Sequence, residues 1–147
     1  MARILVVTIA HPPADARIAN RQIGALLEHG HTVTYAAPFA AFGQEPRVGV
    51  RAIDLPRSAG HPLRRVPALA AAVRTVLTER ARQDLVLVHD PELLPALAAA
   101  RLPGRHRPAA VWDVHEDVPA QVAMLDLPAW LKRPVAGAIH AAELVAE

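Results

Sequence analysis

The chain has 147 residues, and its content of 52% hydrophobic and 20% charged residues is typical of one globular domain with a substantial core. The formal net charge is only +2, and the arginines are scattered. The sequence therefore lacks the clustered basic face and stacking aromatics of a nucleic-acid-binding protein. The absence of cysteine excludes disulfides and thiolate zinc sites.

The sequence contains no targeting signal that we recognise. The apolar run at residues 4–10 is too short for the core of a signal peptide, and no apolar run reaches the roughly 18 residues of a membrane span. We therefore expect a cytoplasmic protein. A small basic stretch is interpreted as a solvated turn, with peripheral contact to anionic membrane lipid or to a partner as the alternative: Arg101, Arg105, His106 and Arg107.

The first part of the chain predicts a β-α-β unit. The continuous apolar run at 4–10 indicates a strand that is covered on both faces. Asp15 is placed to cap the helix that follows, and Gly30 to end it in the left-handed conformation. Residues 32–37 form the second strand, and a right-handed crossover makes the two strands parallel.

The middle of the chain continues this alternation. We expect a loop over 39–47 and a third, more polar strand over 48–55 at the edge of the sheet. A long helix then follows, whose expected apolar face consists of Leu69, Val73, Val76 and Leu77. Residues 85–88 form the fourth strand.

In the last part of the chain, Asp90 is expected to cap a helix with Pro91 in its first position, and Pro95 predicts an irregular first turn. Residues 109–114 form the fifth strand. A short helix at 119–125 and a last helix from Pro128 complete the expected elements.

This alternation predicts one α/β domain over residues 1–147, a doubly wound Rossmann-like parallel sheet with strand order 3-2-1-4-5. The order reverses between strands one and four, where such sheets bind ligands at the carboxyl ends of their strands. Because successive side chains alternate, Asp113 and His115 share one face of strand five. The expected crevice is lined by His11, Asp15, His89, Asp90, His115 and Glu116.

Each of these side chains also has a purely structural interpretation. Asp15, Asp90 and Asp117 are equally good helix caps, and His89 is placed for a hydrogen bond to the backbone. A metal site is an alternative for the histidines, although close ligand spacing is missing. The sequence lacks G-x-G-x-x-G, G-x-x-x-x-G-K-[ST] and G-x-S-x-G, which argues against dinucleotide binding, P-loop and serine-hydrolase chemistry.

Three motifs together carry a family resemblance: Asp15-Ala16-Arg17-Ile18, H-D-P-E-L-L-P from His89 to Pro95, and D-V-H-E-D from Asp113 to Asp117. The combination resembles the amino-terminal domain of GT-B glycosyltransferases, most of all the family-4 type of retaining, nucleotide-sugar-dependent enzymes. The likeness covers nearly the whole chain. It implies two Rossmann-like domains that face each other across a cleft, with the acceptor held by the amino-terminal one.

The resemblance also implies roles for single residues. His115 would be the catalytic residue beside the donor sugar, and His89 and Asp90 would lie next to it. Asp15 and Arg17 would bind substrate at a helix amino terminus, which suits anionic groups. Asp113 and Glu116 complete the implied substrate-binding set. The resemblance implies no metal and no other cofactor, and since His11-Pro12-Pro13 replaces the usual glycine-rich loop, the acceptor stays unknown.

In the family, the nucleotide-sugar donor is bound by a carboxyl-terminal domain with two glutamates eight residues apart, and these 147 residues do not include it. We therefore expect a half-enzyme that is inactive alone. We also expect a homodimer, formed through the aliphatic face of the last helix: Val135, Ile139, Ala142 and Val145. The alternatives are a non-catalytic Rossmann-like partner module and half of another GT-B-like nucleotide-sugar enzyme, such as an epimerase.

Overall fold

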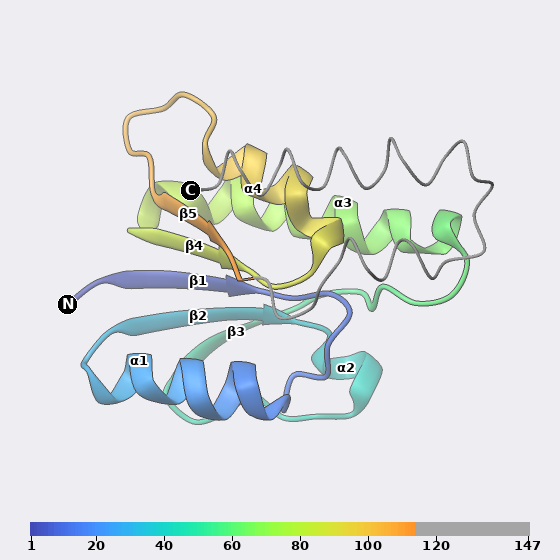
Figure 1. Cartoon of the computed structure of the whole chain (residues 1–147), viewed down its shortest axis with the longest axis horizontal. Helices are drawn as coiled ribbons and strands as arrows, with labels where there is room; N and C mark the ends of the chain where they lie inside the picture. Colours follow the sequence, from blue (N-terminus) through green and yellow to red (C-terminus); the bar gives the residue numbers. More distant parts are fainter. Residues whose placement is uncertain (114–147) are drawn as a thin grey trace. The chain divides into compact units, whose positions relative to one another are not determined.

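The computed structural model describes residues 1–113, apart from the side chains of Pro62 and Arg64, and these residues form one compact unit (Figure 1). A five-stranded, all-parallel sheet in the order β3-β2-β1-β4-β5 lies at its centre. Both the predicted α/β fold class and the predicted strand order are confirmed. The strands are β1 (Arg3–Val7), β2 (Thr32–Ala37), β3 (Val50–Asp54), β4 (Leu85–Val88) and β5 (Ala109–Trp112).

Helices cover both faces of this sheet. The segment between β1 and β2 lies on one face, and α3 and α4 lie together on the other (Figure 1). The helical elements are η1 (Ala16–Ile23), α1 (Gly24–Glu28), α2 (Phe39–Phe42), α3 (Pro62–Glu79), η2 (Arg80–Arg82), η3 (Pro91–Leu93) and α4 (Leu94–Ala100). None of the helices within the described part of the chain combines the length and the apolar character that a membrane crossing needs.

The core on the η1 and α1 face is aliphatic with one aromatic contact. Alternate residues of β1 and β2 pack there against Ile18 and Ile23 of η1. Tyr35 meets Phe39 edge-on, with ring centroids 5.4 Å apart and planes at 83°. Burial of these side chains is the main source of stability on this face.

The core on the opposite face corrects the predicted apolar face of α3. Leu77 is 42% exposed, whereas Ala68 and Ala72 are buried together with Val76. The neighbouring helix α4 also buries small side chains, among them Ala96 and Ala100. Small side chains allow two helices to approach closely, so alanines take the positions that larger residues were expected to fill.

Several local predictions are confirmed. Asp15 caps η1 by accepting hydrogen bonds from the backbone N–H groups of Arg17 and Ile18, and Gly30 adopts a φ of 77°. The third strand lies at the edge, although it spans only Val50–Asp54. The expected loop at 39–47 contains the short helix α2, which makes that prediction wrong in part.

The first strand is also shorter than predicted, ending at Val7 instead of residue 10. The N–H groups of Ile9 and Ala10 turn away from the sheet and donate to the side chain of Asp90. The helices predicted at 119–125 and from Pro128, and with them the expected dimer contact, lie outside the described residues.

Candidate functional site

Polar side chains gather at the carboxyl ends of β1, β4 and β5. Because β1 pairs with β4, and β4 with β5, in parallel, the residues that follow these three strands meet at one edge of the sheet. Thr8 follows β1, His89 and Asp90 follow β4, and Asp113 follows β5. This is the topological switch point at which the sequence placed the crevice.

The carboxylate of Asp90 lies at the centre of the first part of this site. It is 1% exposed and accepts hydrogen bonds from four groups of the loop after β1. Its Oδ2 atom accepts from Ile9 N at 2.5 Å, Ala10 N at 3.3 Å and Thr8 Oγ1 at 3.0 Å. Its Oδ1 atom lies 2.6 Å from His11 Nδ1. Asp90 therefore ties the β1 loop to the end of β4.

This network moves the pKa of both partners in a way that favours an ion pair. Burial acts to raise the pKa of Asp90, but the hydrogen bonds from His11 and Ile9 outweigh it, and the pKa lies below its usual value. The hydrogen bond to Asp90 likewise outweighs burial at His11 and raises the pKa of the imidazole. His11 is thus protonated over a wider pH range than a free histidine.

The second part of the site joins η1 to the end of β5. Gln22 Nε2 donates to Asp113 Oδ2 at 2.8 Å, and His89 Nδ1 lies 3.7 Å from the same oxygen. The His89 side chain is fully buried, while that of Asp113 is 27% exposed. Gln22 is held there by a π-helical segment, a rare geometry that often occurs at functional sites.

Asp15 and Arg17 lie on the loop that leads from β1 into η1. Asp15 Oδ1 accepts from Arg17 N at 2.9 Å, and the two side chains form an ion pair at 3.4 Å. Burial acts to raise the pKa of Asp15, but these bonds with Arg17 bring it below the usual value. The Tyr35 hydroxyl supports the same loop by donating to the carbonyl of Pro13 at 3.2 Å. The capping role of Asp15 is therefore established.

The structure brings some of the predicted residues together and corrects the role of one. His89 adjoins Asp113, and Asp90 joins His11, as the convergence of strand ends predicted. However, the Asp90 side chain does not cap η3, because it points back to the loop after β1. His115 and Glu116 lie outside the described residues.

Sequence reasoning missed two contributors, Thr8 and Gln22. Thr8 lies inside the apolar run at 4–10 that predicts a buried strand, and Gln22 is a polar residue on a helix without any recognisable motif. A signal for Thr8 existed, because a threonine that ends an aliphatic run at the carboxyl end of a strand faces the ligand side of the sheet. Gln22 offered no such signal, because its contact to Asp113 joins residues 91 positions apart.

The arrangement is suited to binding polar, hydroxyl-rich molecules. A carboxylate such as Asp113 accepts hydrogen bonds from hydroxyl groups, and a histidine whose Nδ1 is held by a carboxylate presents its Nε2 for donation or proton transfer. Among residues 1–113, no three His, Cys, Asp or Glu side chains lie close enough together to hold a metal ion. A comparison with protein-family models and with curated protein sequences gives no match.

Proposed function

We propose that this chain is the acceptor-binding half of a nucleotide-sugar-dependent retaining glycosyltransferase. The observation that carries the proposal is the convergence of His11, His89, Asp90 and Asp113 at the switch point of a 3-2-1-4-5 sheet. Carboxylates and imidazoles at this place offer the acceptors and donors that sugar hydroxyls need. The three motifs that resemble family-4 enzymes fall on or beside the same strand ends.

The proposal assigns each residue a role. Asp113 contacts a hydroxyl-bearing substrate, with Gln22 holding its carboxylate and the buried His89 beside it as a positioning residue. The Asp90–His11 pair fixes the loop after β1 and presents the imidazole. His115 follows Asp113 by two residues and acts at the reacting centre, as the family resemblance implies.

The donor side of the reaction provides the sharpest test on this chain. The resemblance gives the diphosphate and nucleoside to a second domain, and the carboxylates at the proposed site repel a diphosphate. Calorimetric titration of the 147-residue chain with nucleoside diphosphates and their sugars should therefore show no binding in the micromolar range. Micromolar binding that shifts the amide signals of Thr8, Gln22 and Asp113 would place the donor site in this half and overturn the acceptor assignment.

A positive test uses the gene and the enzyme that it encodes. If the reading frame continues into a second Rossmann-like domain with two glutamates eight residues apart, His115→Ala in that two-domain protein should lower turnover about 10²–10³-fold at an unchanged melting temperature. Near-normal turnover of a well-folded His115→Ala variant would contradict the catalytic role.

A non-catalytic partner module is the second candidate, and one observation favours it. Asp90 is fully buried, and its oxygens already accept bonds from four groups, which is typical of a structural carboxylate. A reading frame that stops shortly after these residues would support this candidate. One that continues into a donor domain would exclude it.

A further inference from the structure

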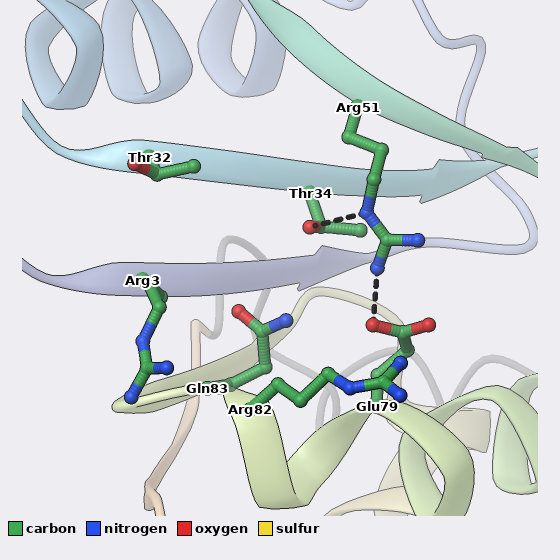
Figure 2. A pocket seen from close by; sticks show the side chains of 7 residues that line it. All are labelled: Arg3, Thr32, Thr34, Arg51, Glu79, Arg82 and Gln83. Atoms are coloured by element: carbon green, nitrogen blue, oxygen red, sulfur yellow. Dashed lines mark hydrogen bonds and ion pairs between the residues drawn. The ribbon is translucent and has the colours of Figure 1, made fainter.

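A cavity of about 410 Å³ lies at the opposite end of the sheet, near the amino ends of the strands (Figure 2). Its floor consists of four side chains from three adjacent strands: Arg3 of β1, Thr32 and Thr34 of β2, and Arg51 of β3. The strand register pairs Arg3 with Thr32 and Thr34 with Arg51. These side chains therefore share the face of the sheet that also carries α3.

The wall of the cavity comes from the end of α3 and from the residues after it. Glu79 is the last residue of α3, Arg82 ends η2, and Gln83 precedes β4. Figure 2 shows the side chains of Glu79 and Gln83 directed towards the strand floor, whereas the Arg82 side chain runs along the wall in the direction of Glu79. We call these seven residues together the arginine pocket.

Two of the three arginines in the arginine pocket already have partners but keep free donors. Arg51 Nε donates to Thr34 Oγ1 at 3.3 Å, and its Nη2 pairs with Glu79. Arg3 pairs with Asp84 through Nε at 3.3 Å and Nη2 at 3.0 Å. These bonds use only Nε and Nη2, and a guanidinium carries five N–H donors. The Nη1 groups of Arg3 and Arg51 therefore have no partner among residues 1–113.

Arg82 supplies the net positive charge of the arginine pocket. Within residues 1–113 it makes no ion pair, whereas Arg3 and Arg51 are each matched by one carboxylate. The carbonyl groups at the end of α3 act against an anion in this place. The unmatched guanidinium of Arg82 offsets that effect, because a full charge exceeds the partial charge of a helix end.

Gln83 adds a neutral hydrogen-bonding group to the arginine pocket. The residue is only 4% exposed, but the atoms of its carboxamide stay open to the cavity. In Figure 2 the carboxamide points into the cavity between Arg3 and Arg82. Its NH2 group can donate to a ligand there, and its oxygen can accept.

We propose that the arginine pocket binds a phosphate group carried by a small polar molecule. The donors are Arg82, the free Nη1 groups of Arg3 and Arg51, the threonine hydroxyls and the carboxamide of Gln83. Arg82 can donate two parallel bonds to an oxyanion, and the free Nη1 groups of Arg3 and Arg51 can each add a charge-assisted bond. The volume is within the range of small-molecule sites and exceeds that of phosphate alone.

This site is separate from the proposed glycosyltransferase function. It lies at the amino ends of the strands, and it binds its ligand without a nucleotide-sugar or a second domain. The paired arginines and the opening to solvent limit the strength of binding, so we expect millimolar affinity for inorganic phosphate and tighter binding for pyrophosphate.

The test is a nuclear magnetic resonance titration of the 147-residue chain with inorganic phosphate and pyrophosphate at constant ionic strength. We expect saturable shifts of the side-chain amide signal of Gln83 and of the backbone amides of Thr34 and Gln83. Arg82→Gln should weaken binding about tenfold or more, because it removes a charged hydrogen-bond donor.

The matched control is Arg74→Gln. Arg74 is exposed on α3 and does not line the cavity, so this variant changes the net charge equally and should leave the affinity unchanged. Two results would overturn the proposal: no saturable shift with either anion, or equal weakening by the two substitutions, which would indicate attraction to overall charge. Chloride at the same ionic strength should produce no saturable shift.

Discussion

At the carboxyl end of the sheet the carboxylate of Asp90 is 1% exposed, whereas at the amino end the side chains of Asp84 and Arg3 are 37% and 54% exposed. Both carboxylates have a lowered pKa, for different reasons. At Asp90 several hydrogen bonds have to outweigh burial. At Asp84 the hydrogen bonds and charge of Arg3 bring the pKa to about 2.

A lowered pKa alone therefore does not measure how much an ion pair contributes to the free energy of unfolding. Water screens the exposed pair and solvates either partner after the other is removed. The buried pair has no such replacement, so the loss of one partner leaves donors unsatisfied in the interior. Substitutions at the carboxyl end of the sheet should therefore lower the stability more than substitutions at the amino end. The exposed arginines at the amino end should keep hydrogen-bond donors for a ligand.

The largest loss of stability is expected from Asp90→Ala. The substitution leaves Thr8, Ile9 and His11 without their acceptor, and we expect it to lower the free energy of unfolding by about 3 kcal/mol. Urea unfolding followed by circular dichroism measures this. Asp90→Asn, which keeps the volume and one acceptor oxygen, should lower the free energy of unfolding less than Asp90→Ala does. A stability of Asp90→Ala equal to that of the unsubstituted chain would show that the buried network contributes nothing.

The second largest effect is a pH dependence of the free energy of unfolding, caused by His11. Its pKa is raised in the folded chain, so its contribution is fully present below the unfolded value of about 6.5 and is lost as the pH rises through the folded value. The stability of the unsubstituted chain relative to His11→Gln should therefore fall over this range.

The same titration has a built-in control. In Asp90→Asn the imidazole loses its carboxylate partner, so its pKa, measured from the ring proton resonances, should drop back towards or below the usual value. A His11 pKa that is unaffected by Asp90→Asn would contradict the ion pair as its cause.

A smaller effect is expected from Gln22→Ala, which removes the hydrogen bond to Asp113. This bond is partly buried, and its loss should cost about 1 kcal/mol in thermal or urea unfolding. Gln44→Ala is the matched control, because Gln44 accepts from Ala14 N at an exposed position. If the two glutamine substitutions have equal effects, burial does not decide the outcome.

The smallest effect is expected from Asp84→Ala, since its pair with Arg3 is exposed. The unfolding midpoint should change less than in Asp90→Ala, His11→Gln or Gln22→Ala, and added salt should reduce the change, because exposed charges are screened over about 10 Å at 0.1 M. The effect of Asp90→Ala should persist in salt. A salt-resistant loss at Asp84 would remove the distinction between the two ends.

The α/β class, the order of the strands and the bounds of two of them, residues 32–37 and 85–88, could be predicted from the amino-acid sequence. The cap at Asp15 and the left-handed turn at Gly30 could be predicted from it as well. These features depend on local signals, namely apolar runs and residues suited to the ends of a helix. Parallel pairing then followed from the handedness of the crossovers.

The contacts of the polar side chains at the strand ends could not be predicted in this way, because they depend on the three-dimensional packing. Asp90 was equally well placed to cap a helix, and its bond to Thr8 joins residues 82 positions apart. Gln22, the arginine pocket and the alanine face of α3 likewise depend on neighbours that are distant in the sequence. Spacing along the chain indicates the face of an element, but the partner across that face is set by packing in three dimensions.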